Sequence, residues 1–287
     1  MSKDARFSPP FFVFVTFTLF VFARIAVGQT LPYETENFII VNAPDALTAK
    51  QFGDAAEQYR HDLSLLWLGK TLPNWSSKCP VRVQVGANLG AGGATTFVFD
   101  NGEVYDWDMD IQGSKERILD SVLPHEITHT VFATYFRSPI PRWLDEGAAT
   151  SVEHINEKKQ YQQLLKTFLA SDSLQCLPFN KLVTLKEYPD DPMPFYAQGH
   201  SVVEYLLLLG EQLGGQTETH RHLVQFTETV MATGDWHSAL QKHYQVATLG
   251  NLQMDWIAWL DRKNRAATPN ELATTVRGNY GRSVYER

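Results

Sequence analysis

The chain has 287 residues, of which 44% are hydrophobic and 20% are charged, and its formal net charge is −7. A chain of this length and composition can bury a sizeable core as one large domain or two lobes, which excludes an intrinsically disordered protein. The acidic balance provides no basic surface, so the composition argues against a nucleic-acid partner.

The first 28 residues have the pattern of a secretory signal peptide. A weakly basic start leads into the apolar run FFVFVTFTLFVFA (11–23), and small residues follow at 26–28. We therefore expect cleavage near Gly28 and an exported protein that is secreted, periplasmic or held at the cell surface. An uncleaved membrane anchor is the alternative, although the run is short for a bilayer span and Arg24 ends it.

Residues 29–112 are expected to form a small, mixed, β-rich N-terminal lobe. Asn101-Gly102 lies between two β-rich runs, which is the strongest short signal for a hairpin. Asp45 stands before an amphipathic segment and is a candidate N-cap. The expected elements are a strand at 37–43, a helix at 45–69, a strand at 80–87 and the hairpin at 94–111.

The two cysteines, Cys79 and Cys176, allow a single disulfide bond, which an exported chain can form. Two free buried thiols are an equally open interpretation. Two cysteines this far apart in the sequence would not by themselves build a metal site.

Residues 113–263 are expected to form a mostly helical lobe, and residues 264–287 a loose polar tail. A β-rich lobe followed by a helical lobe defines an α+β protein. Pro124 destabilises its helix only slightly if Asp120 or Ser121 caps that helix, because the proline then falls in the first turn. Segments with helical periodicity cover 120–136, 143–170, 195–210, 218–232, 235–244 and 250–262.

The segment LPHEITHTVFATYF (123–136) places two histidines four positions apart. On a helix, His125 and His129 point the same way one turn apart, so their imidazoles can converge on one ion. Zinc favours such nitrogen ligands, and Glu126 can reach a zinc-bound water as a general base. A half-exposed helix face without any ligand is the alternative to this metal site.

Glu146, in the segment PRWLDEGAATSVE (141–153), is the expected third ligand. A catalytic zinc takes three protein ligands and leaves one position open. The connection at 137–141 is short, so the helices that it joins must pack as neighbours. The residues around Glu146 are apolar, and a carboxylate buried among them requires a compensating cation. The alternative is an exposed acid near a helix N-terminus.

HEITH (125–129), followed by WLDEG (143–147), resembles the gluzincin metallopeptidases, which include thermolysin-like, aminopeptidase-N-like and peptidase-MA-like domains. The resemblance covers about residues 120–210 and implies a zincin-like fold that holds one Zn²⁺ ion. It implies that the zinc ligands are His125, His129 and Glu146, and that Glu126 activates the water.

A second match lies in FYAQGHSVVEYLLLLG (195–210), where a tyrosine stands three residues before a glycine at the start of an apolar helix. In aminopeptidase-N-like enzymes the matching tyrosine donates a hydrogen bond to the oxyanion. The resemblance implies this role for Tyr196, with Gly199 as the matching glycine. A core tyrosine on an amphipathic helix is the alternative. His200, one turn along, is either a second donor or a structural residue, and we favour the structural role.

Two departures from the family pattern refine the expected activity. The aminopeptidases carry a Gly-x-Met-Glu-Asn strand whose glutamate holds the substrate amine, whereas this chain has GAGGATTFVFDNG (90–102) in that region. The missing glutamate favours an endopeptidase over an aminopeptidase. Thermolysin-like enzymes place an aspartate four residues after the glutamate ligand, where this chain has Thr150. The hydrogen-bond partner that supports the zinc ligands is then one of four groups: Asp145, Thr150, Glu153 or a backbone carbonyl.

We therefore expect an exported zinc metallopeptidase that acts on a peptide or protein substrate. An extended substrate could pair with residues 92–99 if these form an edge strand rather than a core strand. Two other functions stay open: a non-catalytic binding module stabilised by zinc, and a zinc amidase acting on a non-protein amide such as a cell-wall peptide. A membrane contact is expected only if the N-terminal segment stays uncleaved, and the sequence predicts no oligomeric state.

Overall fold

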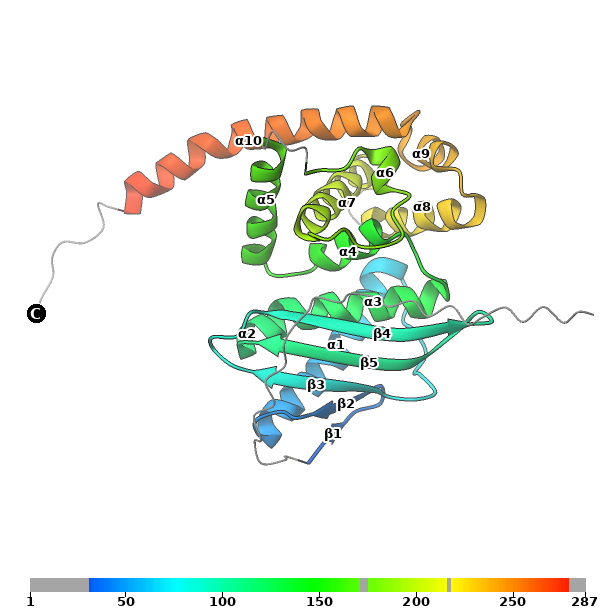
Figure 1. The fold of residues 1–287 in the computed structure, drawn as a ribbon, viewed down its shortest axis with the longest axis vertical. Coiled ribbons are helices and arrows are strands. Elements are labelled where there is room, and N and C mark those ends of the chain that lie inside the picture. Colours follow the sequence, from blue (N-terminus) through cyan, green and yellow to red (C-terminus); the bar gives the residue numbers. More distant parts are fainter. Residues whose placement is uncertain (1–30, 171–174, 216–217, 279–287) are drawn as a thin grey trace, which may run out of the picture.

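The computed structural model describes residues 31–170, 175–215 and 218–278, with side chains as far as Arg265. The expected signal peptide lies outside these residues. Within the described part of the chain, no helix is both long and apolar enough to cross a membrane. A five-stranded mixed sheet forms on the N-terminal side and the remainder is mostly helical, so the α+β class is confirmed (Figure 1).

The sheet has the strand order β1-β2-β3-β5-β4. The three central strands run parallel, whereas β1 and β4 pair antiparallel at the two edges, so residues 92–99 belong to an edge strand. The hairpin about Asn101 and Gly102 is confirmed, and both residues have positive φ (49° and 77°), as a type I′ turn requires. The strands are β1 (Tyr33–Glu34), β2 (Phe38–Val41), β3 (Cys79–Val85), β4 (Gly92–Asp100) and β5 (Glu103–Gly113).

Figure 1 shows α3 lying across the sheet, between the strands and the later helices. The Asp45 side chain caps α1 by accepting a hydrogen bond from the N–H of Thr48, as expected. The helical elements are α1 (Ala46–Leu68), α2 (Lys115–Arg117), η1 (Ile118–Val122), α3 (Leu123–Phe136), α4 (Arg142–Ser151), α5 (Ile155–Ala170), α6 (Phe179–Leu182), α7 (Met193–Gly214), α8 (Thr219–Thr233), α9 (Trp236–Tyr244) and α10 (Leu249–Gly278).

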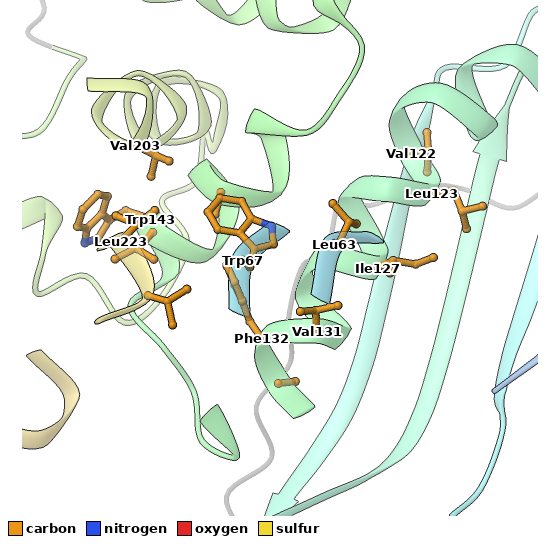
Figure 2. Close-up of a cluster of buried hydrophobic side chains, with 14 of the residues drawn as sticks. Leu63, Trp67, Val122, Leu123, Ile127, Val131, Phe132, Trp143, Val203 and Leu223 are labelled. Atoms are coloured by element: carbon orange, nitrogen blue, oxygen red, sulfur yellow. The ribbon is translucent and has the colours of Figure 1, made fainter. Parts of the chain in front are cut away.

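One continuous group of buried apolar side chains joins the sheet to the helices. Figure 2 shows Trp67 of α1 beside Phe132 of α3, and their ring centroids are 5.2 Å apart. Trp143 of α4 and Val203 of α7 extend the same group away from the sheet. Because α3 is buried between the sheet and the helices, its side chains are held from both directions.

The helical run that leads into α3 begins earlier than the sequence predicts. Ser114, and not Asp120 or Ser121, caps this run by accepting a hydrogen bond from the N–H of Arg117. The run then passes through η1, a π-helical turn, into α3. Proline lacks an N–H and clashes with a carbonyl one turn back, and the wider π turn makes room for Pro124.

One other expectation about the helices is wrong. The helix expected at 143–170 is two helices, because the chain turns at 152–154 between α4 and α5. This turn carries Glu153 toward α3, where it contacts His125. Residues 264–278 of the expected polar tail continue helix α10, and residues 279–287 lie outside the described residues.

Of the two alternatives for the cysteines, the structure has two free thiols. Cys79 is buried in β3, and Cys176 is partly buried in the segment before α6. Burial raises the pKa of both thiols, that of Cys176 to about 11, so both stay protonated at neutral pH.

Candidate metal centre

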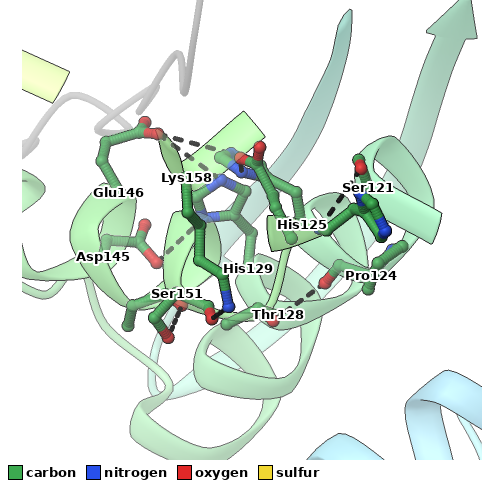
Figure 3. A network of polar contacts seen from close by, with 12 residues as sticks. Ser121, Pro124, His125, Thr128, His129, Asp145, Glu146, Ser151 and Lys158 are labelled. Carbon is green, nitrogen blue, oxygen red and sulfur yellow. Dashed lines mark hydrogen bonds and ion pairs between the residues drawn. The ribbon is translucent and has the colours of Figure 1, made fainter. Parts of the chain in front are cut away.

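The candidate metal centre lies where α3 and α4 meet. His125 and His129 stand one turn apart on α3, and the short connection after α3 places Glu146 of α4 beside them (Figure 3). Glu146 Oε2 lies 3.5 Å from Nε2 of His125 and 3.8 Å from Nε2 of His129. One ligand atom of each residue lies within 4.8 Å of the others. The structure thus brings together the three residues that the sequence singled out as ligands.

A carboxylate holds each imidazole at its other ring nitrogen. His125 Nδ1 lies 2.7 Å from Glu153 Oε1, and His129 Nδ1 lies 2.9 Å from Asp145 Oδ1, the latter contact drawn in Figure 3. A carboxylate on Nδ1 fixes the tautomer whose Nε2 carries a free electron pair, and it makes that nitrogen a stronger ligand. Of the supports that the sequence left open, Asp145 and Glu153 therefore reach the histidines.

Glu146 is buried, and its two oxygens face different partners. The hydroxyl of Tyr188 donates to Oε1 at 2.5 Å, which leaves Oε2 facing the histidines. Two glycines allow α7 to approach α4 at this level. A Cβ added to Gly147 would lie 2.4 Å from the carbonyl oxygen of Gly199, and one added to Gly199 would lie 2.8 Å from that of Trp143. Larger residues would separate the two helices.

Glu126 turns from α3 toward the edge strand β4. The hydroxyl of Thr95 donates to Glu126 Oε2 at 2.6 Å, and both side chains are buried. A Cβ added to Gly93 would come within 2.6 Å of Glu126 Oε1, so the glycine leaves the space that this carboxylate occupies. Strand β4 therefore fixes the position of the proposed general base.

A cavity of about 300 Å³ opens beside these residues. The β4 side of its wall includes 91–93, and the α5 and α7 side includes Tyr161 and Tyr196. Burial raises the pKa of Tyr196 well above its ordinary value, and the charge of Glu146 raises it further. The hydroxyl of Tyr196 therefore stays protonated and can donate a hydrogen bond into the cavity.

The carboxylates determine the charge of the histidines. Burial alone would lower the pKa of both imidazoles, but Glu146 and Glu153 raise that of His125 well above its ordinary value. Asp145 and Glu146 likewise outweigh burial and raise the pKa of His129 to about 9. Burial would raise the pKa of Glu146, but the hydrogen bond and charges of the two histidines lower it. The cluster therefore stabilises positive charge at its centre.

The donor set fits a divalent cation. Nε2 of His129 is buried and has no hydrogen-bond partner among the described residues. Four carboxyl groups, those of Glu126, Asp145, Glu146 and Glu153, surround only two imidazoles. A cation beside the two Nε2 atoms would offset this excess. Two nitrogens and one carboxylate oxygen are a ligand set that catalytic zinc uses.

His200 of α7 lies apart from this ligand set. It is buried, and neither of its ring nitrogens has a hydrogen-bond partner in the described part of the chain. Burial lowers its pKa to about 3, so the ring is neutral at physiological pH. Its ring centroid is 6.2 Å from that of Tyr161, and it does not line the cavity that contains Tyr196. This placement favours the structural role over the second-donor role.

Sequence reasoning missed Thr95 and Tyr188. They lie 31 and 42 residues from the carboxylates that they hold, so no local spacing reveals either contact. Gly93 was a weak signal for Thr95, because a glycine inside a strand often marks the close approach of another group.

Comparisons with known proteins give no relative for this chain. No family model matches it, and neither the curated proteins nor the solved structures contain a significant match.

Proposed function

We propose that this protein is an exported zinc-dependent endopeptidase with a zincin-like fold of the gluzincin type. The observation that carries the proposal is the convergence of His125 Nε2, His129 Nε2 and Glu146 Oε2 beside a cavity that Glu126 also lines. Zinc bound by these three residues would lower the pKa of a coordinated water to about 7 and polarise the substrate carbonyl. Export rests on the pattern of residues 1–28 alone.

Glu126 is the proposed general base. Its carboxylate takes the proton of the attacking water and then delivers that proton to the leaving amine nitrogen. Burial raises the pKa of Glu126, which brings its proton affinity closer to that of the groups with which it exchanges a proton. Thr95 holds one oxygen of this carboxylate, so its orientation is set before the substrate arrives.

Tyr196 is the proposed oxyanion donor. It stands in the first turn of α7 and lines the same cavity as Glu126. Its raised pKa keeps the proton on the hydroxyl, which can then stabilise negative charge as it develops on the carbonyl oxygen.

The edge strand β4 is the proposed platform for an extended substrate. It is last in the strand order, and its first residues, Gly92 and Gly93, line the cavity next to Glu126. Main-chain hydrogen bonds to such an edge tolerate many side chains, which suits a peptide substrate.

The cavity favours internal cleavage over removal of N-terminal residues. A free substrate amine needs an uncommitted carboxylate, but every glutamate that lines the cavity already has a partner. Glu126 accepts from Thr95, Glu146 from Tyr188, Glu153 contacts His125, and Glu157 accepts from Arg117. Two of these carboxylates have a proposed role in the site and the other two already pair with His125 or Arg117, so the described lining offers no glutamate dedicated to a free substrate amine.

The test is to incubate the purified protein with a diverse peptide library, with and without a chelator, and to read the products by mass spectrometry. We expect internal cuts that the chelator abolishes. Glu126→Gln should keep zinc but lose hydrolysis by several orders of magnitude, because the amide cannot accept the proton.

Each other result points elsewhere. Stepwise loss of N-terminal residues would indicate an aminopeptidase, and full activity of Glu126→Gln would remove Glu126 from the mechanism. Tightly bound metal without any cleavage would favour the zinc-stabilised binding module. Cleavage confined to cell-wall peptides would favour the amidase.

A further inference from the structure

Tyr188 lies in the segment 183–192, which connects α6 to α7 without regular structure of its own. Its hydroxyl donates to Glu146 Oε1 at 2.5 Å. Its ring centroid is 5.8 Å from those of both Phe195 and Tyr196, so the ring also contacts the first turn of α7. One side chain thus connects a proposed metal ligand to the proposed oxyanion donor.

Arg142 holds the same tyrosine from a second direction. The guanidinium of Arg142 lies 4.6 Å from the centroid of the Tyr188 ring, and Arg142 Nε donates to the carbonyl oxygen of Lys186 at 2.5 Å. Cation–π contacts of this kind are attractive and orient the ring. The segment that carries Tyr188 is therefore fixed to the start of α4 by two separate contacts.

The spacing of Arg142 and Glu146 explains why both reach one tyrosine. They stand four residues apart on α4, so they lie on the same face of the helix, one turn from each other. Arg142 meets the face of the ring, and Glu146 meets the hydroxyl at its end. Helix α4 therefore holds Tyr188 by its ring face and by its hydroxyl, and the same helix carries Glu146, the proposed metal ligand.

We propose that Tyr188 is the positioning residue for Glu146, and that Arg142 holds Tyr188 in place. The hydroxyl occupies Oε1, which directs Oε2 toward the Nε2 atoms of His125 and His129. With Glu153 on His125 and Asp145 on His129, each of the three ligands then has its own supporting hydrogen bond. This inference rests on the proposed function, because it assumes that these three residues bind zinc.

The zinc affinity of Tyr188→Phe tests this role without relying on hydrolysis. This variant keeps the ring, its contact with Arg142 and its packing against α7, and it removes only the hydroxyl. We expect its zinc affinity, measured on the full chain by competition with a chelator of known affinity, to fall by about 10–100-fold. We expect a smaller fall for Arg142→Leu, because the hydroxyl of Tyr188 remains.

Tyr135→Phe is the matched control. The hydroxyl of Tyr135 also donates to a glutamate, Glu228, at 2.6 Å, but this pair does not line the cavity. Its zinc affinity should equal that of the unmodified protein. Without metal, Tyr188→Phe should melt at a lower temperature than the unmodified protein, because the buried carboxylate of Glu146 loses a hydrogen bond. Added zinc should raise the melting temperature of Tyr188→Phe less, because the stabilisation depends on the ratio of zinc concentration to Kd.

The outcomes separate this inference from the proposed function. If the unmodified protein binds zinc and Tyr188→Phe binds it equally tightly, the positioning role is wrong and the proposed function stands. If Tyr188→Phe binds zinc more weakly only at temperatures where its metal-free form is partly unfolded, Tyr188 acts through stability alone and the inference is overturned. If the unmodified protein binds no zinc, the proposed function fails and this inference fails with it.

Discussion

Two regions of this molecule, on α3 and on α7, hold histidines whose hydrogen-bond partners differ. On α3, each imidazole of His125 and His129 has a carboxylate on Nδ1. On α7, His200 has a partner on neither nitrogen among the described residues. His129 on α3 and His200 on α7 are both buried, so burial alone does not distinguish the two regions.

The difference shows what prepares a histidine to bind a cation. Burial lowers the pKa of His200 to about 3, and the positive charges of Lys158 and Lys263 lower it further. At His129 the same burial is outweighed by Asp145 and Glu146, and the pKa rises to about 9. The carboxylates therefore make the α3 region able to hold positive charge, as a proton or as a metal ion.

The largest effect should come from deleting one histidine in each region. We expect His129→Ala to lose stoichiometric zinc and all measurable hydrolysis, because a tetrahedral site then lacks one of its three protein ligands. His200→Leu should keep both. Metal content by mass spectrometry, together with peptide turnover, measures the contrast. Equal metal content in the two variants would abolish the distinction between the regions.

Tyr196→Phe should give the next largest effect. The change removes one hydroxyl from the cavity wall, and kcat should fall by about 10²–10³-fold if that hydroxyl stabilises only the transition state. KM and zinc affinity should stay the same, because Tyr196 is not among the ligands. An unchanged kcat would mean that Tyr196 has only a structural role, as we infer for His200.

Asp145→Asn sharpens the comparison by weakening one supporting carboxylate. The amide loses the charge that raises the pKa of His129, so zinc affinity should fall by about 10–100-fold. Asp110→Asn is the control, since Asp110 pairs with Arg82 on the sheet, away from the cavity. Zinc affinity that is equal in both variants would show that the carboxylate on Nδ1 has no effect on the site.

The smallest effect concerns the pH dependence of stability. The pKa of His200 is about 3 in the folded protein and near 6.5 in the unfolded chain. Between these values the unfolded chain binds more protons, so this residue makes the folded state less stable as the pH falls from 6.5 toward 3. His200→Leu should therefore lose less of its free energy of unfolding than the unmodified protein between pH 7 and pH 5. Denaturant unfolding at both pH values measures this, and parallel losses would mean that His200 is not buried as a neutral ring.

The parts of the fold and site that follow from sequence depend on local spacing. The four-residue interval between His125 and His129 places them on one helix face, and the short connection brings Glu146 alongside. The turn at Asn101 and Gly102 and the cap at Asp45 are equally local, because each depends on the chemistry of neighbouring residues.

The remaining features depend on distant parts of the chain. Tyr188 reaches Glu146 across 42 residues, and Thr95 reaches Glu126 across 31, so only the packed fold brings these pairs together. The sequence predicts a single helix at 143–170 because helical periodicity continues through residues 152–154. The contact of Glu153 with His125, which the break between α4 and α5 allows, depends on the packed fold and leaves no pattern in the sequence.

The central claim is that His125, His129 and Glu146 bind one zinc ion. X-ray absorption spectroscopy at the zinc K-edge, on protein reconstituted with one equivalent of zinc, tests it most directly. We predict two imidazole nitrogens and oxygen ligands at about 2.0–2.2 Å, with the nitrogen contribution reduced in His129→Ala and unchanged in His200→Leu. A spectrum with sulfur ligands, or a protein that retains no zinc after reconstitution, would contradict the assignment of His125, His129 and Glu146 as its ligands.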